Sequence, residues 1–194
     1  MTPERRTQAE RSAATRGLLI DAAIGSLIDR GWAATTSVEV CARAGVTRGA
    51  FVHHFDSLPE LLAAALRSIY EDRPAPRREQ LPTTLVEVID RTWSVISEPR
   101  FKAVIEAWLA MTNDPLLAKD IGPVVMAFAA RMNPTSASGL LGSADRKGFY
   151  LMAREAMLGL ALGRATNGGK PLGHEAAVLK TLRASAHQFD GDMK

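Results

Sequence analysis

Residues 36–55 read "TSVEVCARAGVTRGAFVHHF", and this stretch decides the fold of the N-terminal part of the chain. Thr36 followed three residues later by Glu39 forms a capping box, which predicts the start of a short helix. Gly45 allows the chain to turn sharply, and Thr47 can cap a second short helix. Helices this short persist only when they pack on neighbours, so the stretch predicts a helix-turn-helix unit.

The two sides of the second short helix are expected to differ. The side chains that we expect in the core of the unit are Val38, Cys41, Val46 and Phe51. Those expected to point outward are Arg48, Gly49, Val52 and His53. In helix-turn-helix proteins the start of the second helix enters the major groove, where an arginine can donate two hydrogen bonds to guanine. Arg48 is placed to do so.

The rest of the chain shows helical periodicity and no convincing strand, so the predicted fold class is all-α. Apolar stripes at helical spacing run from Leu19 to Ile28, from Leu85 to Ile96, from Phe101 to Leu109 and from Leu117 to Met132. Further helices are expected over about residues 57–71, 145–166 and 174–188, and the two short ones should end near Arg43 and His54.

Residues 73–82 contain three prolines and few apolar residues, and they mark the predicted boundary between two domains. The first domain, residues 12–72, is expected to be a three- or four-helix DNA-binding unit. The second, residues 83–194, is expected to be a larger helical bundle.

Composition and charge limit the class of function. The 194 residues are 46% hydrophobic and 23% charged, as in ordinary globular proteins. There is one cysteine, Cys41, which we expect to be a small buried apolar residue. With no secretory signal and no apolar run long enough for a bilayer, a cytoplasmic location is expected.

The distribution of charge does not by itself favour DNA binding by the front of the chain. Residues 1–60 carry seven basic and seven acidic side chains, so their net charge is zero. The net charge of +3 arises in residues 111–194, where ten basic side chains face seven acidic ones. DNA binding therefore depends on how the charges are arranged locally.

Over roughly residues 12–70 the chain resembles the DNA-binding domain of the TetR family of transcriptional repressors. The matching features are "AA" in the first helix, "RG" followed by an aromatic residue, "TT", "ARAGVTRGAFVHHF" and "ELL" at their spacing. The resemblance implies DNA contacts from Thr36, Thr47, Arg48, Gly49, Val52, His53 and His54. It places His53 towards the base edges and His54 near a phosphate.

Two positions depart from the family pattern. Val52 stands where relatives usually carry a tyrosine that donates to a phosphate, and Leu58 stands where they commonly carry a lysine. Val52 can offer only apolar contact, for example to a thymine methyl group. We expect a shallower dependence of DNA affinity on salt than in relatives with both residues. Arg5 and Arg6, together with Arg11 and Arg16, are candidates to compensate, some by reaching a minor groove.

The pair His53-His54 has rival interpretations. Neighbouring positions on a helix point about 100° apart, so the two imidazoles cannot bind one metal ion from that helix. The chain has four scattered histidines and one cysteine without zinc-ligand spacing, so no metal is predicted. The remaining alternatives are DNA contact, which the resemblance favours, and two solvated histidines.

No enzyme motif and no cofactor motif stand out. "GRATNGGK", residues 163–170, superficially resembles a phosphate-binding loop. A glycine occupies the place of the required lysine, no hydroxyl residue follows Lys170 and no strand precedes the stretch, so helix capping explains it better. We predict that the protein is not an enzyme and uses no cofactor.

Aromatic and methionine residues gather behind the predicted boundary, and the resemblance implies an effector pocket there. The candidate lining residues are Trp93, Phe101, Trp108, Met111, Phe128, Met132, Phe149 and Met152. The alternative for each of them is an ordinary core position. Such residues suit an apolar or aromatic effector, and Arg131, Arg154 and Glu155 are candidate polar anchors.

The helix over residues 145–166 is apolar on more than one face, which suggests that a second copy of the chain covers it. The expected interface residues are Leu158, Ala161, Leu162, Ala165, Val178, Leu182 and Phe189. The predicted function is a homodimeric repressor that reads a palindromic operator in double-stranded DNA and releases it on effector binding. The alternative is a helical small-molecule-binding or protein-interaction module without sequence-specific DNA binding.

Overall fold

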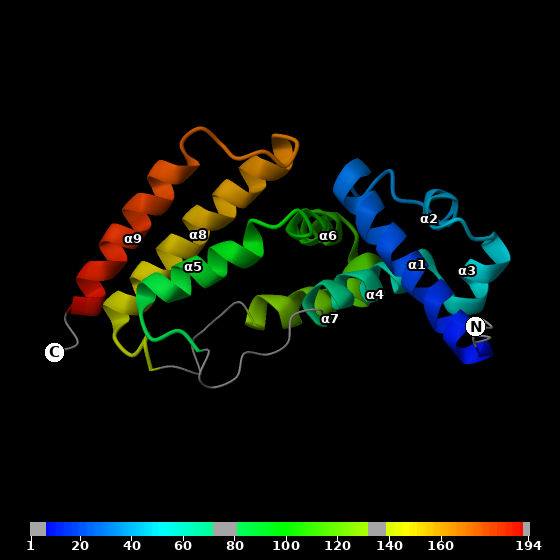
Figure 1. The fold of residues 1–194 in the computed structure, drawn as a ribbon, viewed down its shortest axis with the longest axis horizontal. Coiled ribbons are helices and arrows are strands. Elements are labelled where there is room, and N and C mark those ends of the chain that lie inside the picture. Colours follow the sequence, from blue (N-terminus) through cyan, green and yellow to red (C-terminus); the bar gives the residue numbers. More distant parts are fainter. Residues whose placement is uncertain (1–6, 72–80, 132–138, 192–194) are drawn as a thin grey trace, which may run out of the picture. The chain divides into compact units, whose positions relative to one another are not determined.

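The computed structural model describes residues 7–71, 81–131 and 139–191. Within these ranges it contains nine α-helices and no strand, so the all-α prediction is confirmed (Figure 1). The helices are α1 (Gln8–Arg30), α2 (Ser37–Ala44), α3 (Arg48–His54), α4 (Leu58–Glu71), α5 (Leu85–Ile96), α6 (Phe101–Asn113), α7 (Pro115–Arg131), α8 (Ala144–Thr166) and α9 (Glu175–Gly191). The predicted ends of the two short helices agree with α2 and α3 to within one residue.

The chain divides into two compact units that interleave along the sequence. The first consists of Met1–Arg73 and Ala103–Met126, and the second of Pro74–Lys102 and Ala127–Lys194. The expected boundary at residues 73–82 lies largely outside the described residues. The grouping of Ala103–Met126 with the N-terminal helices is not one that local sequence patterns predict.

In the first unit, α1 packs against α2 and α4, and α3 contacts both α1 and α2 (Figure 1). The apolar core that joins these helices includes Leu19, Leu27, Val40, Phe51, Phe55 and Leu61, each no more than 5% exposed. Helices as short as α2 and α3 gain their stability from this shared core rather than from their own hydrogen bonds.

Side-chain caps fix the limits of the two short helices. The hydroxyl oxygen of Thr36 accepts from the N–H of Glu39 across 3.2 Å at the start of α2. Gly45 ends α2 with a φ of 66°, a left-handed conformation that favours glycine. Thr47 caps α3 in the same way as Thr36 caps α2, because its hydroxyl oxygen accepts from the N–H of Ala50 across 3.2 Å.

The expected burial of Val38 is wrong, because its side chain is 68% exposed. Helix α2 instead buries Val40 and Cys41, which are 0% and 8% exposed. Val38 precedes Val40 by two residues and so lies about 200° away around the helix. The other three residues expected in the core are buried or partly buried there.

In the second unit, α5, α8 and α9 pack on one another (Figure 1). Tyr150 on α8 is fully buried and packs with Val88 of α5 and with Leu140. The carboxylate of Asp190, near the end of α9, accepts from the backbone N–H of Leu85 across 2.8 Å and so caps the start of α5. No helix in the described part of the chain is long and apolar enough to cross a bilayer.

Candidate DNA-binding surface

Helix α3 is fixed through one side and open on the other. On its inner side Phe51 is 5% exposed and, just past its end, Phe55 is 1% exposed, with the two ring centroids 6.2 Å apart. The four residues expected to point outward, Arg48, Gly49, Val52 and His53, are all exposed. The predicted orientation of the helix is therefore confirmed, and its outer side is free to meet a partner.

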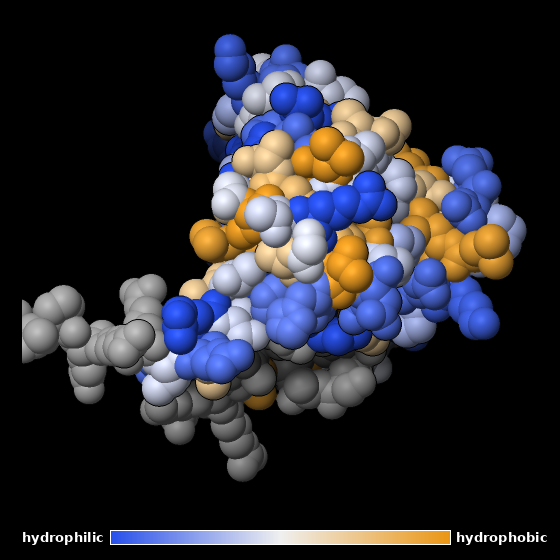
Figure 2. Space-filling view, turned by 90° about the vertical axis from the view of Figure 1, so that its right-hand side faces the viewer, coloured by the Kyte–Doolittle hydropathy of each residue, from blue (hydrophilic) through white to orange (hydrophobic). Residues whose placement is uncertain are grey.

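The outer side of α3 combines one cation, one apolar group and imidazoles. Arg48 is the first residue of the helix, and Val52, one turn later, is 58% exposed. A Cβ on Gly49 would meet no atom closer than Thr47 Oγ1 at 3.7 Å, so the chain's own packing does not require glycine there. A glycine on this side lets a partner approach the backbone closely. On the face of the molecule shown in Figure 2, apolar side chains lie among hydrophilic ones.

The two histidines of α3 differ in exposure. His53 is exposed and His54 is half-buried, and their rings lie edge to face with centroids 5.0 Å apart. Among the described residues, no group of three or more histidine, cysteine or acidic side chains could hold a metal ion. Each of these imidazoles can donate a hydrogen bond to a partner.

The hydroxyl groups of the two capping threonines can still donate a hydrogen bond to a partner. Thr36 and Thr47 are both exposed, and each accepts the helix N–H through a lone pair of its hydroxyl oxygen. The hydroxyl proton is not used in the cap, so each threonine can also donate to an anionic oxygen. Both residues were expected to contact DNA, and their geometry suits donation to phosphate.

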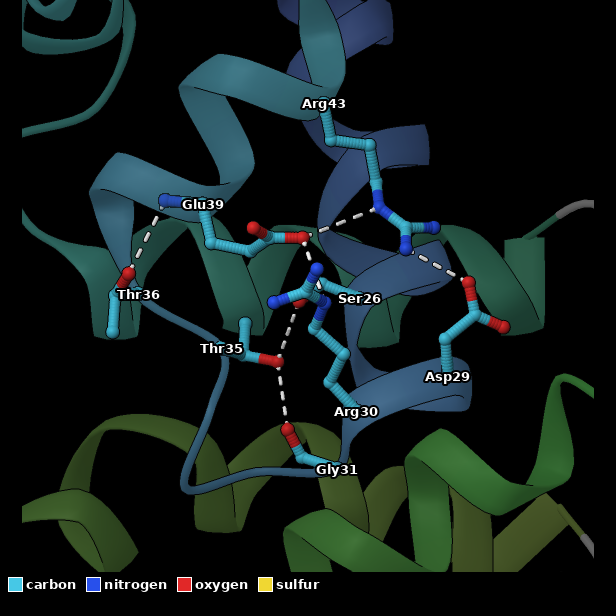
Figure 3. A network of polar contacts seen from close by, with 8 residues as sticks. All are labelled: Ser26, Asp29, Arg30, Gly31, Thr35, Thr36, Glu39 and Arg43. Carbon is cyan, nitrogen blue, oxygen red and sulfur yellow. Dashed lines mark hydrogen bonds and ion pairs between the residues drawn. The ribbon is translucent and has the colours of Figure 1, made fainter.

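A buried hydroxyl network fixes the turn between α1 and α2 (Figure 3). The Thr35 hydroxyl donates to the carbonyl oxygen of Gly31 across 2.8 Å, and Thr35 Oγ1 lies 3.0 Å from the hydroxyl of Ser26. Because the Thr35 proton is used for Gly31, Ser26 is the donor in the second bond. Ser26 and Thr35 are 0% and 4% exposed, so an unmade bond here would be costly.

Ion pairs between charged side chains also connect α2 with the end of α1 (Figure 3). Oε1 of Glu39 lies 3.2 Å from Nε of Arg30 and 3.7 Å from Nε of Arg43. Nη2 of Arg43 also donates to Asp29 across 2.8 Å. The Glu39 carboxylate therefore pairs with the two arginines instead of accepting from the backbone N–H of Thr36, as a complete capping box requires. Only the Thr36 half of that box is formed.

Arg16, on α1, lies close to the end of α3. Its Cζ lies 4.9 Å from the ring centroid of Phe55, which directly follows α3. A cation held over a buried ring is fixed beside the end of that helix. Arg5 and Arg6 lie outside the described residues, so their expected DNA contacts stay predictions.

Cys41 is buried beneath this surface, as expected. Burial raises the pKa of its thiol, and the charge of Arg48 lowers that pKa to a smaller extent. A neutral buried thiol behaves as a small apolar group of the core.

Comparison with known proteins decides what this domain is. A family model described as bacterial regulatory proteins, tetR family, matches residues 19–65. The HTH-type transcriptional regulator CymR of Pseudomonas putida is 35% identical over 127 residues, which cover 62% of this chain and 63% of that protein. Residues 19–65 therefore form a helix-turn-helix domain of the TetR type.

A further relative shows over how much of the chain the sequence similarity extends. The HTH-type transcriptional regulator TtgR, also of Pseudomonas putida, is 43% identical over 67 residues, which cover 34% of this chain and 31% of that protein. The chain thus spans less than two thirds of the length of the curated relatives that it matches.

Solved structures extend the likeness in fold to most of the chain. A transcriptional regulator from Rhodococcus sp. Rha1 has a TM-score of 0.63 at 22% identity, over 89% of this chain and 96% of that one. Salmonella enterica GusR has a TM-score of 0.58 at 19% identity, over 96% and 98%. At these identities the comparison shows the TetR-type fold alone.

The expected effector-lining residues are distributed over both units. Phe101 and Phe128 lie in the second unit with ring centroids 5.7 Å apart, and Trp93 lies under the guanidinium of Arg164. Trp108 and Met111 belong to the first unit. The remaining three are Phe149, whose ring centroid is 4.9 Å from that of Phe189, Met152, which is 58% exposed, and Met132, which lies outside the described residues.

The expected dimer residues fall into two groups. Ala161 and Leu182 are 4% and 6% exposed, so the chain's own packing already covers them. The others, Leu158, Leu162, Ala165, Val178 and Phe189, are exposed or half-buried. A second copy would meet this latter group directly, with Ala161 and Leu182 packed behind it.

Proposed function

We propose that this chain is a ligand-responsive transcriptional regulator of the TetR type that acts as a repressor. The observation that carries the proposal is α3 itself: it is anchored through Phe51 and Phe55 and presents Arg48, Val52 and His53 outward. Arg48 is proposed to read guanine and Val52 to contact a thymine methyl group. Thr36 and Thr47 are proposed to donate to phosphates on either side of the helix.

The proposed regulator is a homodimer whose subunits meet through α8 and α9. Met152, Gly159 and Leu162 follow one another at intervals of seven and three residues, so they share one side of α8. A Cβ on Gly159 would meet nothing within 4 Å, so the chain's own packing does not call for a glycine at this position. A close-packed partner helix accounts for both the glycine and the exposed apolar side chains. A two-fold symmetric dimer presents two identical copies of α3, so its operator is expected to be a palindrome.

The proposed effector is a small apolar or aromatic molecule bound among the aromatic residues that follow α4 in the sequence. Paired rings such as Phe101 and Phe128, and the ring of Trp93, favour such a ligand. Effector binding would favour a conformation in which the two recognition helices do not fit adjacent grooves, with α4 as the connecting lever. Effector and operator would therefore each lower the affinity for the other.

The test is selection of bound sequences from random double-stranded DNA with the purified protein. We expect an inverted repeat whose half-sites are about one helical turn apart, ~34–36 Å. A titration of that palindrome against a scrambled duplex, with and without apolar ligands from a thermal-shift screen, then checks release. Enrichment of no sequence, with equal binding of both duplexes, would favour a binding module that does not read DNA.

A further inference from the structure

A carboxylate from α6 contacts the turn that joins α1 to α2 (residues 31–36, the α1–α2 turn). The backbone N–H of Trp32 donates to Oε2 of Glu106 across 3.0 Å, in a partly buried position. The two residues are 74 positions apart in the sequence and belong to the same compact unit. A helix far along the chain therefore holds this turn in addition to the turn's own hydrogen bonds.

Gly31 leaves the space that this carboxylate occupies. A Cβ on Gly31 would lie 3.1 Å and 3.2 Å from the two carboxylate oxygens of Glu106, closer than ordinary van der Waals contact. Gly31 also has a φ of 77°, which other residues rarely adopt. The glycine thus serves two purposes, to end α1 and to admit Glu106.

The α1–α2 turn sets the position of the recognition helix. Thr35 in the turn is tied to α1 through Gly31 and Ser26, and the next residue, Thr36, caps α2. Helix α2 in turn packs on α3. Because the turn, α2 and α3 are linked in this way, a displacement of the turn would move the DNA-reading side of α3.

A carboxylate is an unfavourable group at this place unless it receives a hydrogen bond. The carbonyl end of α1 carries partial negative charge, which repels the carboxylate of Glu106. The N–H of Trp32 offsets this repulsion. The position of the carboxylate therefore depends on this hydrogen bond.

We propose that Glu106 is a positioning residue for DNA recognition, which holds the α1–α2 turn from α6 and thereby sets α3 for the major groove. The inference rests on the proposed function, since it assigns a means of regulation to the same DNA-binding surface. Loss of one hydrogen bond to a charged group corresponds to about tenfold weaker operator binding.

The first experiment compares operator affinities of Glu106→Ala and Glu106→Gln with wild type. We expect about a tenfold loss for Glu106→Ala and a loss of no more than about twofold for Glu106→Gln, because the amide oxygen can still accept from Trp32. Asp120→Ala, which removes an exposed carboxylate from α7 in the same unit, is the matched control and should bind as wild type does. Wild-type affinity in Glu106→Ala would overturn the inference. Absence of operator binding by wild type would instead overturn the proposed function.

The second experiment separates positioning from a general loss of stability. Amide exchange across residues 32–36 should be about tenfold faster in Glu106→Ala, while exchange in the buried part of α1 stays at the wild-type rate. Gly31→Ala should also weaken operator binding, and the double variant Gly31→Ala/Glu106→Ala should lose less than the sum of the two single losses, because the crowding is relieved. Strict additivity, or faster exchange throughout the unit, would contradict the inference.

Discussion

Nε of Arg164 donates to Oε2 of Glu175 across 2.7 Å and so joins the end of α8 to the start of α9. The Glu175 side chain is 9% exposed, and the same guanidinium lies over the ring of Trp93 with Cζ 5.0 Å from its centroid. Nη1 of Arg164 also donates to the carbonyl oxygen of Ser97 across 3.0 Å. One cation therefore connects three segments of the second unit.

The Arg164–Glu175 pair predicts a stability that depends on pH. The hydrogen bond and charge of Arg164 hold the pKa of the Glu175 carboxyl below its ordinary value of 4.5. A lowered pKa in the folded state means that the stabilisation is present above about pH 4.5 and is lost as the pH falls through the folded pKa. Glu175→Gln should lower the free energy of unfolding at pH 7 by about 1–3 kcal/mol, and by less at pH 3.5, because the stabilisation begins to fall below pH 4.5.

Urea unfolding at the two pH values measures this difference. Glu155→Gln is the matched control, because it removes a carboxylate that pairs with Arg154 but is 62% exposed. That change should alter the unfolding free energy by no more than about 0.5 kcal/mol. A difference between wild type and Glu175→Gln that is the same at both pH values would show that the ion pair is not its source.

Val52→Tyr should strengthen binding to the operator backbone and weaken its sequence preference. Val52 is 58% exposed, so the change costs no core packing. A tyrosine hydroxyl can donate to a phosphate, which is worth about a two- to tenfold gain in affinity. The thymine methyl contact is lost at the same time. Competition between the selected operator and single-base variants measures both effects, and unchanged discrimination at every thymine would contradict the role given to Val52.

Leu58→Lys should steepen the dependence of operator affinity on salt. Each lysine that neutralises a phosphate adds about 0.9 to the slope of log affinity against log salt. Leu58 packs partly against the core of the first unit, so a lysine must keep its stem there while its ammonium group reaches solvent. Affinities at four salt concentrations give the slope. An unchanged slope in a folded variant would mean that this position does not face a phosphate.

Arg48→Ala should relax the sequence preference at one guanine of each half-site. The loss of a bidentate contact to guanine costs about 1–3 kcal/mol, and only with operators that carry that guanine. Lys180→Ala removes an exposed cation from α9 in the second unit and serves as the control for net charge. A loss of affinity that is uniform across all sequences would assign Arg48 to phosphate contact instead.

Gly159→Leu should convert the proposed dimer into a monomer. Nothing within 4 Å would meet a Cβ at this position, so the isolated chain can accommodate a larger residue. The leucine would instead hold apart two helices that need close approach. Gly122→Leu on α7, where a Cβ also meets nothing within 4 Å, is the matched control. Sedimentation at micromolar concentration distinguishes the two variants, and an intact dimer in Gly159→Leu would exclude an α8 interface at this point.

Local sequence signals predict the helix limits in the first unit well. Thr36, Gly45 and Thr47 act through bonds to residues within four positions, so their roles can be inferred without the fold. Val38 shows where such signals fail. In an eight-residue helix the spacing of Val38 and Cys41 and the spacing of Val40 and Ala44 each suggest an apolar side, and only packing on α1 selects between them.

Contacts between distant parts of the sequence could not be predicted. Glu39 was expected to complete its own cap, but Arg30 and Arg43 compete for its carboxylate. Glu106 lies on a helix whose apolar periodicity gives no sign of what a half-buried carboxylate meets. Arg30 lies on α1 and Trp32 in the α1–α2 turn, so the helical spacing within α2 or α6 carries no information about these two partners.

The capping threonines restrict which residues can replace them. Aspartate caps a helix about as well as threonine does, so a chain with aspartate at position 36 or 47 would fold. It would also place a negative charge where the exposed hydroxyl of Thr36 or Thr47 now lies, and phosphate would be repelled. Folding alone tolerates several residue types at these positions, whereas the proposed phosphate contacts also require a side chain that keeps a hydrogen-bond donor.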